Sequence, residues 1–267
     1  HAVRVVNYSG CAVCLTPDTP GIVYRDRPLE HFEAIVPRIG PAGTFYGTTV
    51  VRQFETLGSF VVNSAEAIAR SRDKFCCLQL LARAGIAVPR TSLALSPDDL
   101  DALVASVSHG PLIIKLLQSS KGNGVIRAET TQAAKSIIVT LQSLGIDVLV
   151  QEFIQEANGT DLRCFVVGDR VVAAMQRRGK PGEFRANLHQ GGSAEPIELT
   201  PEERSIAVRS AKTMGLQVAG VDLLRSQRGP LVLEVNSSPG LGGIERCTGV
   251  DVAGTIVSFL EAHVLPG

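Results

Sequence analysis

The chain has 267 residues, of which 45% are hydrophobic and 19% charged, and this composition supports sizeable cores and excludes a disordered protein. Lys plus Arg (26) balances Asp plus Glu (26), so no global charge attracts nucleic acid or an anionic membrane. No apolar run approaches the roughly 18 residues that a membrane-spanning helix needs, and no signal peptide is recognisable. These features predict a soluble, cytoplasmic protein that binds neither membrane nor nucleic acid directly.

The first part of the chain alternates predicted strands and helices. The apolar stretch 2–6 predicts an opening strand, and since no initiator Met precedes it, an N-terminal element is expected to be missing. The elements predicted next are a turn-rich stretch at 16–21, a strand at 34–36, a helix over 44–57 and a strand at 60–62. Such alternation is typical of an α/β domain, to which we assign residues 1–72.

Two cysteines in this domain, Cys11 and Cys14, have the spacing of half a zinc site or of a redox pair. A zinc site needs two further ligands, but the sequence has no second CxxC and no HxxxH pair. A redox motif would be followed by a helix, and none is predicted. The sequence therefore favours reduced thiols in a loop.

The remaining chain predicts two α+β lobes, at 73–150 and 151–267, rather than one doubly wound sheet. Helices are expected at 64–70 and 74–84, from Ser96 to about 110, over 132–144, from the capping box at Thr200–Glu203, and from 252. Strands are expected at 111–117, 147–154, 162–167, 171–176, 218–224 and 231–235, with a flexible loop over 119–125.

The last two predicted strands carry acidic and amide side chains. Glu234 and Asn236 are two residues apart, so both project from one face of their strand, while Asp222 interrupts the apolar strand before it. If residues 225–230 form a hairpin, Asp222 lies opposite Glu234. Two carboxylates so close repel unless a cation lies between them, and oxygen ligands point to Mg²⁺ or Mn²⁺. The alternative is an acidic, solvent-exposed sheet face.

Basic residues are found near glycines. Lys115 interrupts the apolar strand Leu112–Leu117, where an ammonium is costly unless it meets an anion, although an edge-strand lysine reaching water is an equally good explanation. The loop that follows has two glycines, Gly122 and Gly124, which allow main-chain N–H groups to approach a phosphate. A further basic run, placed in a Gly/Pro-containing loop suited to an acidic substrate, comprises Arg177, Arg178, Lys180 and Arg185. Together these features predict a nucleoside-triphosphate site without a P-loop.

Several segments resemble the ATP-grasp carboxylate–amine ligases: Asp73-Lys74, Leu80–Ile86, Lys115, Val150–Ile154, Gly220–Asp222 and Glu234–Leu241. Two more, Pro37–Gly40 and Phe184–Gly192, are similar to the RimK group, which adds glutamate to the C-terminus of a small-subunit ribosomal protein and can make glutamate chains. The resemblance covers nearly the whole chain. It implies an ATP-grasp fold that follows a pre-ATP-grasp α/β domain, the latter without its opening strand and helix.

The resemblance also implies roles for individual residues. Lys74 and Lys115 would contact ATP phosphates, with Lys115 also able to reach the adenine; the hinge Glu152, Phe153 and Ile154 would lie against the adenine, and Asp161 would hold the ribose. Arg185, Ala186 and Asn187 would line the reacting phosphate, and Gly122 and Gly124 would belong to the lid. Asp222, Glu234 and Asn236 match the metal-ligand triad for two Mg²⁺ or Mn²⁺ ions.

The implied reaction is an acyl-phosphate ligation. A carboxylate attacks the γ-phosphate of ATP, and an amine then displaces phosphate, with Arg185 stabilising the transferred phosphoryl group. Arg177, Arg178 and Lys180 would bind L-glutamate or an acidic peptide tail. The family suggests a homo-oligomer, in particular a tetramer. Two alternatives stay open, a small-molecule ligase of the lysine-biosynthesis type and a nucleotide-binding homologue without turnover.

Overall fold

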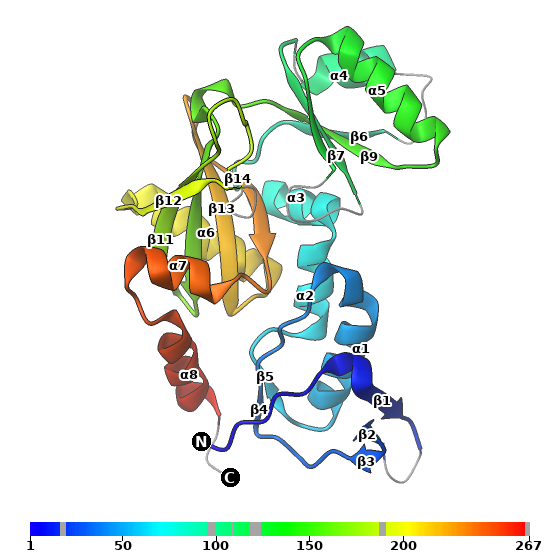
Figure 1. Cartoon of the computed structure of the whole chain (residues 1–267), viewed down its shortest axis with the longest axis vertical. Coiled ribbons are helices and arrows are strands. Elements are labelled where there is room, and N and C mark those ends of the chain that lie inside the picture. The colour runs from blue at the N-terminus through cyan, green and yellow to red at the C-terminus, as the bar shows by residue number, and fades with distance from the viewer. Residues whose placement is uncertain (17–19, 95–99, 108, 118–123, 187–190, 265–267) are drawn as a thin grey trace.

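The computed structural model describes residues 1–16, 20–94, 100–107, 109–117, 124–186 and 191–264. Figure 1 shows three parts, an N-terminal domain at the bottom, a small lobe at the top and a large lobe on the left. Four separate sheets underlie them, of three, two, four and five strands. The two α+β lobes after an α/β domain, which the sequence predicted, are therefore present.

The N-terminal domain contains an antiparallel sheet of β1 (Cys11–Cys14), β2 (Gly21–Tyr24) and β3 (Arg27–Pro28). A parallel pair, β4 (Ala34–Ile35) and β5 (Phe60–Val61), flanks the helix α1 (Thr44–Thr56) in sequence. The short η1 (Tyr8–Gly10) and η2 (Pro41–Gly43) precede β1 and α1. The predicted helix and the parallel strands are confirmed.

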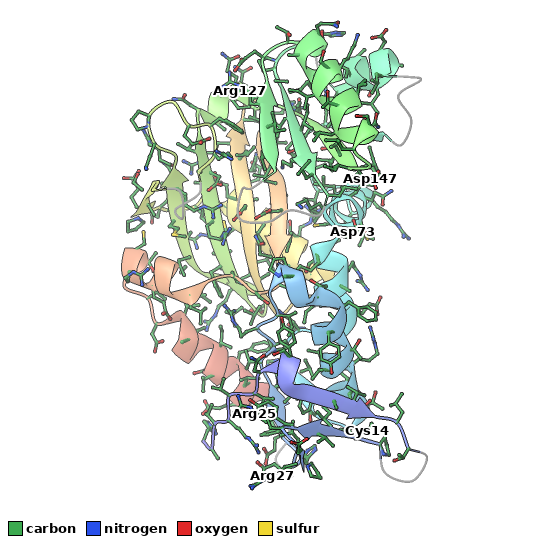
Figure 2. All side chains as sticks on the ribbon, turned by 45° about the vertical axis from the view of Figure 1, so that its right-hand side comes forward. Cys14, Arg25, Arg27, Asp73, Arg127 and Asp147 are labelled. Carbon is green, nitrogen blue, oxygen red and sulfur yellow. The ribbon has the colours of Figure 1, made fainter. Side chains whose placement is uncertain are left out.

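Two predictions for this domain are wrong. Residues 2–6 form no strand, because no described strand pairs with them, and Val3 is 85% exposed and Val5 91% exposed. Cys11 and Cys14 are in strand β1 rather than in a loop. Both thiols are nevertheless free, as expected, and Figure 2 places Cys14 on the three-stranded sheet, far from the lobes.

The small lobe is a four-stranded antiparallel sheet with the order β6-β9-β7-β8. The strands are β6 (Thr91–Ala94), β7 (Leu112–Leu116), β8 (Val125–Ala128) and β9 (Val148–Glu152), and the helices α4 (Leu100–Val107) and α5 (Thr131–Ser143) pack against them. A core of Leu, Ile, Val and Ala side chains fills the space between helices and sheet. The predicted helix start at Ser96 and the loop residues 118–123 lie outside the described residues.

The large lobe is a five-stranded antiparallel sheet with the order β12-β11-β10-β13-β14. Its strands are β10 (Thr160–Val167), β11 (Arg170–Arg178), β12 (Ser193–Pro196), β13 (Val218–Ser226) and β14 (Gly229–Asn236). The α-helices that pack in the large lobe are α3 (Lys74–Arg83), α6 (Pro201–Met214), α7 (Leu241–Thr248) and α8 (Val252–His263). Helix α2 (Ala65–Arg72) packs mainly against α1 of the N-terminal domain. The hairpin of β10 and β11 and the capping box that opens α6 are both as predicted.

Strand β10 shows how the large sheet divides its two faces. Leu162, Cys164 and Val166 point into a core that also contains side chains of α3 and α6. The alternate residues Phe165 and Val167 pack in a second core with residues of α7 and α8. Since side chains alternate along a strand, Asp161 and Arg163 lie on the α7 and α8 face.

Some features of the lobes were missed by the sequence analysis. The strands β6, β8 and β12 and the helix α7 were not predicted, because each is short and weakly patterned. Helix α3, which we assigned to the small lobe, packs against α6 and β14 of the large lobe. Strand β9 belongs wholly to the four-stranded sheet, so the change of sheet falls after residue 152 rather than at 150.

In the described part of the chain, no helix is both long and apolar enough to cross a membrane.

One buried asparagine bonds the N-terminal domain to the large lobe with its whole side-chain amide. Asn63 is 1% exposed, and its Nδ2 donates to the carbonyls of Val218 (2.8 Å) and Ser237 (3.0 Å). Its Oδ1 accepts from the main-chain N–H groups of Gln217 (2.9 Å) and Val218 (3.1 Å). Both donors and both acceptor positions of this amide are therefore used across the junction.

Candidate active site

The acidic residues of the last two strands meet as the sequence predicted. Asp222 of β13 pairs directly with Glu234 of β14, and Gly220 pairs with Asn236. The hairpin turn contains Gln227 and Arg228, because Ser226 pairs with Gly229. A bulge follows Asp222, since the next pair joins Leu223 to Val232. The register therefore makes the two carboxylates direct cross-strand neighbours.

Asp222 is part of a row of alternating charges, which we call the charge ladder: Asp161, Arg177, Asp222 and Arg163. Arg177 donates Nε and Nη2 to the two Asp161 oxygens at 2.6 and 2.7 Å, and Nη2 also reaches Asp222 Oδ2 at 2.8 Å. Arg163 donates to both Asp222 oxygens, with 2.6 Å between Nη2 and Oδ2. Each neighbour has the opposite charge, which such burial requires.

The charge ladder keeps Asp222 ionised although it is only 2% exposed. Burial alone would raise the pKa of its carboxyl, but Arg163 and Arg177 outweigh burial and lower that pKa to about 2. For Arg177 burial would lower the pKa, but Asp222 and Asp161 raise it. A permanently ionised carboxylate therefore lies beside the more exposed Glu234.

Two lysines approach the same carboxylates from the other side. Helix α3 begins at Lys74 because the Asp73 carboxylate caps it, accepting from the N–H groups of Phe75 and Cys76 at 3.0 and 2.9 Å. Lys74 Nζ donates to the carbonyls of Leu116 (3.1 Å) and Leu117 (2.8 Å), at the end of β7. The ammonium of α3 thereby contacts the small lobe.

Lys115 lies inside β7 of the small lobe and is partly buried. It pairs with Val125 on one side and Leu149 on the other, so it is in the interior of the sheet and not on an edge strand. Burial lowers the pKa of its ammonium to about 8, and Glu234 acts in the opposite direction. The same Glu234 charge also opposes the lowering of the Lys74 pKa. Glu234 thus faces cations from α3 and from the small lobe.

The predicted hinge connects the two sheets. Strand β9 ends at Glu152, and η4 (Gln155–Ala157) leads into β10. Glu152 Oε1 accepts from the main-chain N–H of Arg90 (2.7 Å) and from Arg228 in the β13–β14 turn. The main-chain N–H of Phe153 donates to Pro111 O at 3.2 Å.

Side chains from both lobes meet around the hinge. The Phe153 ring lies 4.1 Å from Arg127 of β8 and, edge to face, 6.4 Å from the ring of Phe184. Ile154 is buried beside Leu231. A flat ring bound here would contact aromatic, apolar and guanidinium groups.

Arg185 is held by its near neighbour. Its Nε and Nη2 donate to the Glu183 carboxylate at 2.9 and 2.7 Å, and its main-chain N–H reaches the same carboxylate at 3.1 Å. The loop folds closely onto Gly179, where a Cβ would lie 2.5 Å from Arg185 O and 2.8 Å from Glu183 O. Ala186 is buried, and Asn187 lies outside the described residues.

The basic run after β10 is not one exposed loop, and this corrects the sequence prediction. Arg177 is a buried residue inside β11, because the two carboxylates of the charge ladder neutralise it. Arg178 ends the strand and is exposed, as is Lys180 beyond it. Of these three residues, Arg178 and Lys180 can bind a ligand without breaking a buried ion pair.

The structure describes one of the two predicted loop glycines. Gly122 lies outside the described residues. Gly124 has a φ of +73°, which favours glycine, and its carbonyl accepts from the N–H of Leu116 at 2.8 Å. It therefore closes the hairpin between β7 and β8.

Sequence analysis missed Arg163, Arg72 and Arg38. Arg163 interrupts the apolar run Leu162–Val167, which is the signal that drew attention to Lys115. Arg72, just before Asp73, approaches Glu234, whose charge opposes the lowering of its pKa by burial. Arg38 donates Nη2 to Pro239 O at 2.6 Å, in the segment after Asn236.

The donor set fits a divalent cation. Asp222 and Glu234 lie on adjacent strands, and Asn236 Nδ2 donates to Glu234 Oε1 at 2.9 Å, so three oxygen-bearing side chains share one small region. Asp222 Oδ2 accepts from both Arg163 and Arg177, whereas Oδ1 accepts from Arg163 alone and keeps one lone pair. Among the described residues, no group of three or more His, Cys, Asp or Glu side chains could hold a metal ion, and this set combines two acids with an amide. Asp222, Glu234 and Asn236 are therefore able to hold Mg²⁺ or Mn²⁺.

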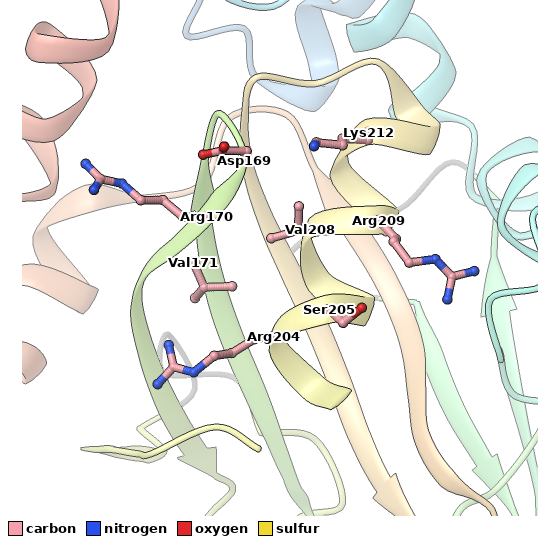
Figure 3. A pocket seen from close by; sticks show the side chains of 8 residues that line it. All are labelled: Asp169, Arg170, Val171, Arg204, Ser205, Val208, Arg209 and Lys212. Atoms are coloured by element: carbon pink, nitrogen blue, oxygen red, sulfur yellow. The ribbon is translucent and has the colours of Figure 1, made fainter. Parts of the chain in front are cut away.

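A separate hollow lies on the opposite face of the large sheet, between the β10–β11 turn and α6 (Figure 3). It is lined by cations of both elements, Arg170, Arg204, Arg209 and Lys212. The charge ladder is on the other face and toward the other end of β10. This hollow is therefore not part of the candidate active site.

Comparisons with known proteins agree with this geometry. The model of the RimK-like ATP-grasp domain matches residues 71–260, and that of the RimK pre-ATP-grasp domain matches residues 1–68. The chain belongs to the RimK-like ATP-grasp family. It is accordingly an ATP-dependent carboxylate–amine ligase, and its fold and enzyme class are those that the sequence predicted.

Relatives of this RimK-like ligase share more than half of its residues. A probable alpha-L-glutamate ligase of Picosynechococcus sp. is 57% identical over all 267 residues and 89% of its own length. One of Trichodesmium erythraeum is 58% identical over the same shares. Among solved structures, the ATP-grasp ligase PsnB with its minimal precursor is 26% identical, with a TM-score of 0.73 over 94% of this chain and 86% of that one. The same ligase has also been solved with Mg and ADP, at 25% identity and a TM-score of 0.71 over 94% of this chain and 85% of that one.

Proposed function

We propose that this RimK-like ligase adds L-glutamate to the C-terminus of a small-subunit ribosomal protein and extends it into poly-glutamate. Its relatives are named as glutamate ligases, which supports glutamate as the amine. PsnB, the structural neighbour, binds a precursor peptide, which supports a peptide acceptor. The observation that carries the proposal is the meeting of Asp222, Glu234, Lys74 and Lys115, brought together from two lobes and α3.

The proposed chemistry follows from those groups. ATP binds between the lobes, with its adenine at Glu152, Phe153 and Ile154 and its ribose near Asp161. Lys74 and Lys115 bind the phosphates and offset their charge, assisted by the main chain around Gly122 and Gly124. Asp222, Glu234 and Asn236 would hold two Mg²⁺ or Mn²⁺ ions, which would supply Lewis-acid charge at the triphosphate.

The acceptor carboxylate then attacks the γ-phosphorus, and ADP leaves. The glutamate nitrogen then attacks the acyl carbon and forms the amide bond. The bond between the acyl carbon and the phosphate oxygen breaks, phosphate leaves, and the amine proton passes to solvent. Arg185, with Ala186 and Asn187 beside it, stabilises the transferred phosphoryl group once it exchanges Glu183 for phosphate. Arg178 and Lys180 attract the acidic tail. Arg177 does not contact the tail and contributes only by its ion pairs in the charge ladder.

Two further proposals concern the setting of the enzyme. Six free cysteines support a reducing, cytoplasmic location. A homotetramer, suggested by the family resemblance, is tested by light scattering of the purified enzyme.

The deciding experiment measures ADP release with Mg²⁺, ATP and glutamate, with and without a ribosomal-protein C-terminal peptide. Peptide-dependent ADP release, with product masses that grow by glutamate units, is the expected result. Turnover with a different amine alone would replace the proposal by a small-molecule ligase. Nucleotide binding without ADP release would replace it by a non-catalytic homologue.

A further inference from the structure

Two arginines beside the metal-ligand residues have no carboxylate partner among the described residues. Arg38, in the segment after β4, donates Nη2 to Pro239 O at 2.6 Å. Arg72, at the end of α2, donates Nη2 to Ile39 O, the carbonyl next to Arg38 in the chain. Four other arginines of the site region are paired with acids, namely Arg163, Arg177, Arg185 and Arg228.

The unpaired state of these two guanidiniums is costly. Loss of water around each lowers its pKa, and for Arg38 no acidic group offsets this effect. Arg72 Nε is buried and has no hydrogen-bond acceptor. Arg38 is partly removed from water with no acidic group to offset the cost, and for Arg72 only the charge of Glu234 offsets it. An anion bound between the N-terminal domain and the large lobe would stabilise both guanidiniums.

Hydroxyl groups at the same junction also lack partners. Ser237 is 2% exposed, and its Oγ has no hydrogen-bond partner in the described structure. The buried Oγ of Ser238 likewise has none. Both follow Asn236 directly, and the next residue, Pro239, is the one that Arg38 contacts. Two hydroxyl donors on one short segment therefore adjoin the contact of Arg38, and Arg72 contacts the residue that follows Arg38.

The position of these groups distinguishes their ligand from the nucleotide. The phosphate-side lysines are connected to the small lobe, where Lys74 contacts Leu116 and Leu117. Arg38 and its contact at Pro239 join the N-terminal domain to the large lobe instead. Planar guanidinium forks with hydroxyl donors match a carboxylate, which accepts several hydrogen bonds in one plane.

We propose that Arg38, Arg72, Ser237 and Ser238 form the pocket for the amino acid that supplies the amine, with the two arginines binding its side-chain carboxylate. This inference rests on the proposed function for the identity of that amino acid as glutamate. The N-terminal domain thereby selects an acidic side chain over its neutral amide. Arg178 and Lys180 remain available for the acceptor tail.

The test compares glutamate with glutamine as the amine substrate of the full-length enzyme. In the Arg38→Gln variant, the new side-chain amide keeps a hydrogen-bond donor for Pro239 O but carries no positive charge. We expect KM for glutamate to rise about 30-fold or more, KM for ATP to stay within about twofold, and the preference for glutamate over glutamine to fall at least tenfold. Arg52→Ala, on the exposed face of α1 in the same domain, is the matched control and should leave all three unchanged.

Each other result has a defined meaning. An equal loss with glutamate and glutamine would overturn the proposal, because it indicates a structural role for Arg38. A weaker ATP affinity at unchanged glutamate KM would overturn it in favour of a phosphate contact. If Arg38→Gln does not fold, Arg38→Lys and Ser238→Ala provide the same comparison. If the wild type uses another acidic amino acid, the proposed function fails, whereas the same loss of preference for that substrate would still support this pocket.

Discussion

Removing the charge of Asp222 should affect both folding and catalysis, whereas removing that of Glu234 should affect catalysis alone. Asp222→Asn leaves the Arg163 guanidinium without its carboxylate, although the Arg163 side chain is only 15% exposed. Breaking a buried ion pair costs about 3–5 kcal/mol. Arg177 retains Asp161, at 2.6 and 2.7 Å, so the expected cost lies near the lower end, about 3 kcal/mol.

That cost converts into a measurable shift. Unfolding entropy of ~2.1 cal/mol/K per residue gives ~0.6 kcal/mol/K for a chain of 267 residues, so ~3 kcal/mol lowers Tm by ~5 °C. Glu234→Gln is the control, because Glu234 is exposed and Gln retains an acceptor for the Asn236 amide at 2.9 Å. Its free energy of unfolding should change by less than ~0.5 kcal/mol.

The assay is thermal unfolding of the two variants and the wild type, together with Mg²⁺-dependent ADP release. Both variants should lose ADP release, and only Asp222→Asn should lose stability. If Asp222→Asn unfolded at the wild-type temperature, the charge ladder would contribute no net stability and our reasoning from burial would be refuted. Full turnover by Glu234→Gln would refute its assignment to the metal site.

Three further substitutions test other parts of the structure. The pKa of Lys115 is lowered to about 8, so the free enzyme holds this lysine largely neutral above that pH, and bound phosphates should return it to the ammonium form. Calorimetry in buffers of different ionisation enthalpy should therefore show proton uptake on ATP binding near pH 8–9 but not near pH 6, and uptake retained by Lys115→Met would contradict this. Asn63→Ala should cost ~3 kcal/mol in urea unfolding, because four buried main-chain groups lose their partner, and a cost below ~1 kcal/mol would disprove its joining role. Gly179→Ala should lower kcat about tenfold or more while Tm changes little, since its Cβ displaces the main chain of Arg185; an unchanged kcat would separate this loop from catalysis.

The sequence predicted the parts of the site that depend on local pattern. Asp222, Glu234 and Asn236 were found from strand alternation and one short hairpin, and the register agrees. Arg163 escaped notice because its partner is 59 residues away, although it interrupts an apolar strand as Lys115 does. Arg177 was misplaced in a loop because a run of basic residues does not show that two acids from neighbouring strands neutralise one of them.

The fold followed the same division. Long amphipathic helices and a capping box were legible, because their signals lie within one segment. The strands β6 and β8 were not, since each has four residues and acquires its strand conformation only by pairing with β9 or β7. The expected strand over 2–6 failed for the converse reason, as an apolar pattern without a neighbouring strand remains irregular.

The charge ladder has a consequence for the order in which ligands arrive. The charges of its two carboxylates and two guanidiniums cancel, so the charge ladder offers no net negative charge to a divalent cation. Only Glu234 adds an acid, and Lys74 and Lys115 oppose it. This charge balance disfavours the binding of Mg²⁺ alone. It favours the binding of Mg²⁺ together with the triphosphate, because the ion and the two lysines then neutralise the phosphate charge. Metal affinity measured without nucleotide should consequently be weak, and nucleotide and metal should bind as one coupled event.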